Sequence, residues 1–82
     1  MTTMKVREEI LKAWNFTIDN EMPDSVIRLY ISGEDDIDIW NEKGYFYFST
    51  GSFRYRGLNE LLDDLCKEID DNRYKVMNVE IE

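Results

Sequence analysis

The chain contains no histidine and only one cysteine, Cys66. Without those side chains it cannot form a zinc site of the usual cysteine and histidine kind, a Ser-His-Asp triad or a Cys-His nucleophile pair. A single cysteine also excludes a disulfide within the chain, which fits a protein in a reducing compartment. We therefore interpret Cys66 as a small apolar residue at the edge of a helix.

Glycine and proline are scarce as well, with four glycines and one proline in 82 residues. The glycines are scattered and match neither GxGxxG nor GxxxxGK followed by serine or threonine, so no phosphate-binding loop is expected. Hydrolysis by two carboxylates needs a cleft that keeps one acid protonated, and a chain this short has little interior volume for one. We expect a protein that is not an enzyme, with no catalytic residues and no cofactor.

Long hydrophobic runs are also missing. No apolar stretch approaches the roughly 20 residues of a membrane span, so we expect no membrane partner. The first residues, MTTMKVREEILKAW, carry charges where the apolar core of a signal peptide would lie. The sequence therefore predicts a cytoplasmic protein.

Basic residues are also scarce. The chain has 10 basic and 18 acidic side chains, and its formal net charge is −8. Nucleic acids and anionic lipids are bound by lysine and arginine, so direct binding to either is disfavoured. Lys43, Gly44 and Tyr45 match the start of the RNA-recognition signature, but Phe46 stands where that signature needs a small residue. We expect the partner to be a basic protein surface, or no partner at all.

Hydrophobic residues make up 43% of the chain, enough for one globular domain over residues 1–82. Helical spacing predicts a helix over 4–14 and a second over 59–71. The second helix has the stronger pattern, with apolar residues at i, i+3, i+4, i+7 and i+11: Leu58, Leu61, Leu62, Leu65 and Ile69.

Alternation of apolar and polar residues predicts strands between the helices and after them. The predicted strand segments are 16–19, 26–32, 36–41, 45–50 with a turn or bulge leading into 53–56, and 74–81. Their core-facing residues are predicted to be Ile27, Leu29, Ile31, Ile37, Ile39, Phe46 and Phe48, and the last strand has Met77, Val79 and Ile81 on one face. The order α-β-β-β-β-α-β predicts an α+β fold, a mainly antiparallel sheet of four to five strands with two helices packed on one face.

The acidic residues are clustered rather than spread. Five carboxylates and no basic residue lie between Glu34 and Glu42, and six carboxylates with Lys67 alone lie between Glu60 and Asp71. On the second helix an acid recurs every four residues, which puts a row at about 6 Å intervals on one face. Like charges at that spacing cost roughly 0.2 to 0.5 kcal/mol per pair, so the row is kept against local stability.

A similar row is predicted on the sheet, where Asp36 and Asp38 project to the same side about 6.6 Å apart, with Trp40 beside them. Ordered negative charge of this kind resembles the phosphates of a nucleic-acid backbone, one per about 3.4 Å of each strand. The predicted partner-binding residues are Glu34, Asp35, Asp36, Asp38, Trp40, Glu60, Asp64 and Glu68.

Three other interpretations stay open. Arg28, Arg54 and Arg56 lie on the same outward sheet face and would make it a neutral mosaic by pairing with Asp36 and Asp38, leaving a merely solvated acidic helix. Clustered acidic oxygens also suit calcium, but the spacing is not that of an EF-hand, so no metal is expected. Finally, the outward tryptophan and tyrosines would serve as a homodimer interface.

Four segments, MKVREEILKAW, VIRLYIS, DIDIW and LNELLDDLCKEIDD, supply a helix, two strands and an acidic helix. In size, acidity and element order the chain resembles small phage-encoded inhibitors such as anti-CRISPR proteins and other DNA mimics. The resemblance implies an inhibitor that occupies the basic nucleic-acid-binding surface of a target enzyme in the host cytoplasm, and it identifies no individual site residue. The alternative is a non-catalytic structural or regulatory α+β module that self-associates through its aromatic sheet face.

Overall fold

The computed structural model describes all residues, Met1–Glu82. Helix α1, Thr3–Asp19, begins where the Thr2 hydroxyl accepts a hydrogen bond from the Lys5 backbone N–H at 3.1 Å. This side-chain cap satisfies one of the backbone donors that a helix start leaves free. Helix α2, Leu58–Asn72, ends at Arg73, whose left-handed backbone (φ 54°) reverses the chain toward the last strand.

The strand predicted over 16–19 is wrong, because these residues form the last turn of α1. Thr17 is buried and donates its hydroxyl hydrogen to the Trp14 carbonyl at 2.7 Å, while Phe16 and Ile18 remain more than half exposed. The buried positions Val6, Ile10 and Thr17 continue one helical stripe. Two alternating apolar residues are too short a pattern to compete with helical hydrogen bonds that are already propagating.

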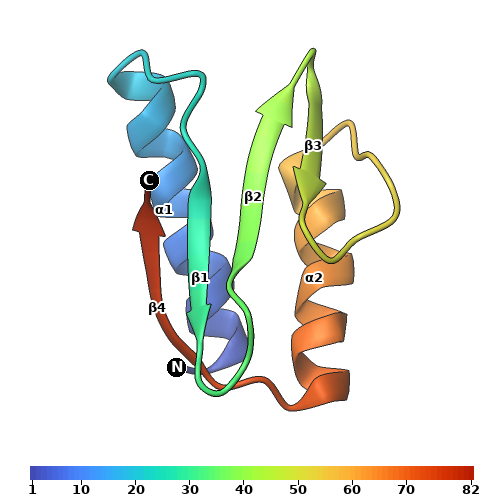
Figure 1. Cartoon of the computed structure of the whole chain (residues 1–82). Helices are drawn as coiled ribbons and strands as arrows, with labels where there is room; N and C mark the ends of the chain where they lie inside the picture. The colour runs from blue at the N-terminus through green and yellow to red at the C-terminus, as the bar shows by residue number, and fades with distance from the viewer.

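The four strands are β1 (Ile27–Ile31), β2 (Ile37–Glu42), β3 (Tyr45–Phe48) and β4 (Val76–Ile81). They form one antiparallel sheet in the order β3-β2-β1-β4, so the last strand lies beside the first (Figure 1). Two helices and a four-stranded antiparallel sheet confirm the predicted α+β fold.

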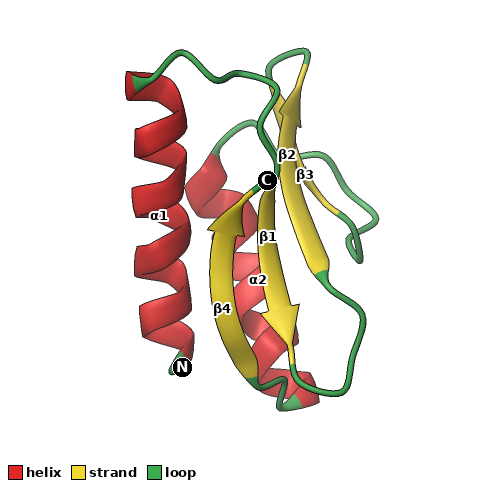
Figure 2. Cartoon of the chain, turned by 60° about the vertical axis from the view of Figure 1, so that its left-hand side comes forward, coloured by secondary structure: helices red, strands yellow, loops and turns green.

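Both helices pack on one face of the sheet, with α1 against β1 and β4 and α2 against β3 (Figure 2). The seven core-facing residues predicted for β1, β2 and β3 are all buried there. They join α1 and α2 side chains in a single core of 16 buried residues. Burial at roughly 25 cal/mol per Å² of apolar surface is the main term that holds these two layers together.

The prediction that Met77 shares one face of the last strand with Val79 and Ile81 is wrong. The pairing of β1 with β4 shifts between Tyr30 and Ile31, which marks a β-bulge, and Val76 takes the core position. Met77 is the extra residue and is 57% exposed, while Val79 lies opposite Leu29 on the core side as predicted. A bulge changes the face of every residue before it, and strict alternation along a sequence cannot show that change.

The segment after β3 closes one edge of the sheet. Phe46 and Tyr55 exchange two backbone hydrogen bonds, of 2.7 and 2.9 Å, and the Gly51 N–H donates to the Phe48 carbonyl at 2.9 Å. The stretch 53–56, predicted as an extension of the sheet beyond a turn or bulge, therefore contributes a single bridge at Tyr55. Residues 49–57 cover the backbone of β3, which would otherwise be an exposed edge.

Candidate functional site

The outer face of the sheet carries a strong ion pair. The register places Arg28 opposite Asp38, and the guanidinium holds both carboxylate oxygens, at 2.8 Å from Nε and 3.2 Å from Nη2. Asp36 also approaches Nε at 4.0 Å. The hydrogen bonds that Arg28 donates to Asp38 raise the pKa of Arg28. Arg28 therefore offsets one of the two negative charges predicted for this part of the sheet.

The aromatic residues of the outer face are also paired. Trp40 lies opposite Tyr47 and stacks on it, with ring centroids 5.6 Å apart and an angle of 14° between the planes. The Arg54 guanidinium sits 4.4 Å from the centroid of the Tyr45 ring, so it is engaged by an aromatic ring rather than by Asp36 or Asp38. Of the three arginines expected to pair with Asp36 and Asp38, only Arg28 does so, and the neutral mosaic forms only in part.

The row on α2 differs, because no lysine or arginine forms an ion pair with Glu60, Asp64 or Glu68. Two of its members instead accept hydrogen bonds from hydroxyl groups of the 49–57 segment. The Tyr55 hydroxyl donates to Asp64 at 2.7 Å and the Thr50 hydroxyl donates to Glu68 at 2.5 Å. Burial, together with the bond to Asp64, raises the pKa of Tyr55 to about 12. The two carboxylates are therefore held in place by neutral hydroxyl groups and not by a cation.

The far end of α2 adds two more carboxylates, Asp70 and Asp71, in a last turn that has no basic residue. The helix dipole places partial negative charge at this end, so acids here are unfavourable by about 0.3 to 1 kcal/mol each. Asp70 accepts a hydrogen bond from Thr3, and elsewhere on the helix Asp63 is paired with Arg7 at 2.7 Å. Asp63 is thus the one acid of α2 in an ion pair.

The β1–β2 turn presents Glu34 and Asp35, both exposed and without an ion-pair partner. This turn lies at the end of the molecule where α2 finishes, as both views show (Figures 1 and 2). The Ser32 N–H donates to the Lys75 carbonyl at 3.0 Å, which ties the two segments together. The acids of the turn and the end of α2 consequently share one pole of the molecule.

The eight residues predicted to bind a partner do not form one surface. Asp36 directly precedes β2, and Asp38 and Trp40 lie on the outer face of β2, whereas α2 packs on the opposite face. The fold places the β1–β2 turn at the end of the molecule where α2 finishes, so the acids of the turn lie nearer to α2 than to the other end of the sheet (Figures 1 and 2). Sequence reasoning could place acids on a strand or on a helix, but the layer that separates them is set only by packing.

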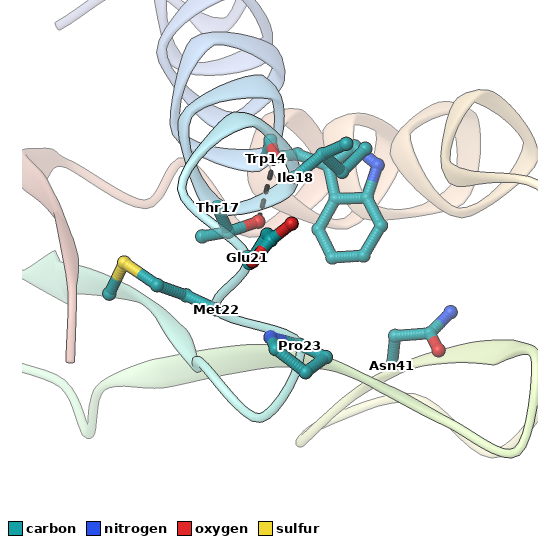
Figure 3. Close-up of a pocket in the computed structure, with 7 residues that line it drawn as sticks. All are labelled: Trp14, Thr17, Ile18, Glu21, Met22, Pro23 and Asn41. Atoms are coloured by element: carbon teal, nitrogen blue, oxygen red, sulfur yellow. Dashed lines mark hydrogen bonds between the residues drawn. The ribbon is translucent and has the colours of Figure 1, made fainter.

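A cavity of about 320 Å³ that sequence reasoning missed lies at the end of α1 (Figure 3). Its wall is formed by α1, the loop that follows, and one residue of β2: Trp14, Thr17, Ile18, Glu21, Met22, Pro23 and Asn41. The lining contains a single carboxylate, so it offers no pair of acids for general acid and base chemistry. Its volume lies at the lower end of small-molecule pockets.

Two further features bear on chemistry. Cys66 is a half-buried free thiol whose pKa is raised by burial, with a smaller opposing effect from Arg7. A raised pKa disfavours the thiolate, the form that reacts. The chain brings together no cluster of three or more side chains suited to a metal ion.

α1 and α2 are 17 and 15 residues long, and neither is long and apolar enough to cross a membrane. Known protein families, curated proteins and solved structures were all compared with this chain, and none of the three comparisons found a match.

Proposed function

We propose that this protein is a small acidic inhibitor that binds the basic nucleic-acid-binding surface of a target enzyme through the exposed face of α2. In this role it acts as a DNA mimic, the function implied by its resemblance to phage-encoded inhibitors such as anti-CRISPR proteins. The observation that carries the proposal is a row of four carboxylates on α2 that no basic side chain of the chain pairs with: Glu60, Asp64, Glu68 and Asp71.

The distribution of ion pairs over the whole chain supports the choice of α2 as the binding surface. Only five of the 18 carboxylates take part in an ion pair, and those pairs use four of the 10 basic side chains. The outer sheet face and α1 contain most of these pairs. The α2 face is left negative, which would attract a positively charged protein over a distance of about 10 Å at moderate salt.

The fixed positions of two α2 carboxylates also support this proposal. Hydroxyl groups of Tyr55 and Thr50 hold the carboxylates of Asp64 and Glu68 in fixed positions before any partner arrives. A side chain that is already ordered loses less conformational entropy on binding, which is worth about 0.5 to 1.5 kcal/mol for each flexible group. A regular array of about 6 Å spacing is then presented to the lysines and arginines of a partner.

The experiment is a pull-down from a bacterial lysate on immobilised protein, loaded at low ionic strength and eluted with salt. Nucleic-acid-binding proteins are expected in the eluate, and added duplex DNA is expected to release them. The variant Glu60→Lys/Asp71→Lys should reduce their retention about tenfold or more, since opposite charges become like charges. One substitution opposes the helix dipole and the other favours it, so α2 itself should stay stable.

A matched control separates the surface from the net charge. Asp19→Lys/Asp24→Lys changes the charge by the same amount at the end of α1, where both residues are exposed. Retention should be nearly unchanged in this control. Equal loss in both variants, or an eluate without nucleic-acid-binding proteins, would contradict the proposal.

A second candidate is a structural or regulatory module that self-associates through the outer sheet face. It is favoured by the stacked pair of Trp40 and Tyr47, which lies half-buried on a face that no helix covers. Exposed tryptophan and tyrosine are enriched in protein interfaces. Sedimentation of the wild type and of Trp40→Ala distinguishes this candidate from the acidic inhibitor.

A further inference from the structure

The sheet has one closed edge and one open edge. Residues 49–57 close the β3 edge through the hydrogen bonds of Phe46 and Phe48 described above. On the opposite edge, β4 pairs with β1 on one side and with no strand on the other. The N-terminal ammonium group of Met1 donates to the Val76 carbonyl at 3.2 Å, so the open part of this six-residue strand lies after Val76. An open strand edge is a template for pairing with another extended segment.

The backbone of β4 shows which residues would make that pairing. Val26 and Glu82 exchange two hydrogen bonds, of 2.7 and 3.4 Å, so they are a hydrogen-bonded pair of the β1–β4 ladder. Because such pairs alternate in antiparallel sheets, Glu80 and Asn78 also direct their backbone groups toward β1. Val79 and Ile81 therefore direct their N–H and C=O groups toward the open edge. The Val79 N–H is held meanwhile by the Asn78 side-chain oxygen at 3.0 Å.

A shallow groove lined by both apolar and charged residues runs beside this edge, between β4 and α1. It has a volume of about 570 Å³ and its walls come from both elements: Glu9, Lys12, Ala13, Phe16, Val79, Glu80 and Ile81. Figure 2 shows α1 alongside β4 over the length of the strand. The Phe16 side chain is 53% exposed at the groove. A fifth strand on β4 would point every second side chain into this groove.

Charge identifies the kind of segment that fits. On the outer side of β4, Glu80 lies opposite Arg28 in the register, but the Arg28 guanidinium is held by Asp38. Glu82 accepts a hydrogen bond from Tyr30, so neither acid is paired with a cation. The one basic residue of the groove, Lys12, is paired with Glu9 at 3.6 Å. With a net charge of −8, a second copy of the chain is repelled, whereas a basic segment is attracted.

We propose that β4 accepts an extended segment of a partner protein in which apolar residues alternate with lysine or arginine. The segment pairs antiparallel with β4 through the outward backbone groups of Val79 and Ile81. Its apolar side chains fill the groove beside Phe16, and its basic side chains lie beside Glu80 and Glu82 on the outer face. This site is separate from the α2 face and does not rest on the proposed inhibitor function.

The test uses a synthetic peptide of alternating valine and lysine, about eight residues long, which covers a strand of this size. Titration into the labelled protein should shift the backbone amide signals of Val79, Ile81 and Phe16 most. Hydrogen exchange of the Val79 and Ile81 amides should slow by about tenfold or more, since each gains a backbone acceptor. A valine and glutamate peptide, and a valine and lysine peptide N-methylated at alternate residues, should not bind.

Variants separate the groove, the charge and the backbone. Ile81→Lys should weaken peptide binding about tenfold. Phe53→Lys also replaces an apolar residue by lysine, at an exposed position outside the groove, and should have no effect. Glu80→Lys should weaken peptide binding about fivefold, because it replaces the attraction between Glu80 and a lysine of the peptide with a repulsion between two lysines. Asn78→Ala frees the Val79 N–H and should tighten binding about threefold.

Shifts centred on α2 or on the outer face around Trp40 would overturn this proposal, and so would equal binding of the glutamate peptide. A dimer that protects the Val79 and Ile81 amides without any peptide would overturn it too, because the edge would then belong to a second copy. The α2 variant Glu60→Lys/Asp71→Lys should bind the peptide like the wild type. Failure at the β4 edge is thus distinguishable from failure of the α2 surface.

Discussion

At the scale of single residues, the most informative groups are those whose partners lie far away in sequence. Arg28 meets Asp38 across two strands, and the hydroxyl of Tyr55 meets Asp64 on α2. Either acid taken alone in the sequence looks like free surface charge. Asp38 is paired with a cation, whereas Asp64 is held in place by a neutral hydroxyl group. The distinction decides which carboxylates remain available to a partner.

Tyr55 supplies a test at this scale. It is 8% exposed, and its raised pKa of about 12 means that the folded state holds the phenolic proton more tightly than the unfolded state, whose tyrosine pKa is 10.0. Its contribution to stability is therefore complete below pH 10 and is lost as the pH rises toward 12. Denaturant unfolding between those pH values should show the decline, and Tyr55→Phe should remove the part due to this residue.

At neutral pH, Tyr55→Phe should lower the free energy of unfolding by about 1 kcal/mol through the lost hydrogen bond to Asp64. Tyr45→Phe is the matched control, because the Tyr45 hydroxyl forms no hydrogen bond within the chain while its ring keeps the contact with Arg54. An identical pH profile for Tyr55→Phe and the wild type would contradict this role for the residue.

At the scale of elements, α2 carries acidic residues at positions where they lower the stability of the helix. Its apolar stripe is continuous and fully buried, which makes the helix stable enough to carry unfavourable charge on the other face. The first turn contains Glu60, which suits the helix dipole, but the last turn contains acids and no base. This pattern is what a surface selected for contact rather than for stability would show.

Asp71→Lys tests that interpretation of α2. Reversing this charge should raise the free energy of unfolding by about 0.5 to 1 kcal/mol, because a cation suits the end of a helix. Repulsion from Lys67 at i−4 and attraction to Glu68 at i−3 largely cancel. Thermal unfolding measures the gain, and Asp24→Lys, with the same charge change in a loop, should give a smaller one. A destabilised Asp71→Lys protein would show that the acid has an internal structural role.

At the scale of the whole molecule, the order β3-β2-β1-β4 leaves the acidic helix and the open edge on different elements. Residues 49–57 close one edge and help to order the α2 carboxylates. The other edge remains available beside α1. The two surfaces that we propose for basic partners therefore lie on separate elements of one chain of 82 residues.

The oligomeric state is the prediction that belongs to this scale. With a net charge of −8 and a paired outer face, the acidic inhibitor is expected to sediment as a monomer over a wide range of protein concentration. If the second candidate function holds, the wild type instead forms a dimer that Trp40→Ala breaks and Glu60→Lys/Asp71→Lys does not. Analytical ultracentrifugation of the three proteins separates the two outcomes.

Local patterns in the sequence were sufficient for much of this fold. The apolar spacing of α2 and the alternation in β1, β2 and β3 predicted the buried residues of those elements, because each pattern records which face of one element leaves water. The sequence also located the acidic windows correctly. It failed where the outcome depends on hydrogen bonds between distant segments: the end of α1, the bulge before Asn78 and the single bridge at Tyr55.

The sequence by itself therefore determined the fold class, the core and the excess of negative charge, since composition and periodicity are properties of the chain. Only the tertiary structure decided which charges remain unpaired, because ion pairs such as Arg28 with Asp38 form between strands brought together by folding. It also decided that β3 is covered and β4 is open. Backbone hydrogen bonds between segments distant in sequence set the edges of a sheet, and no local pattern encodes them.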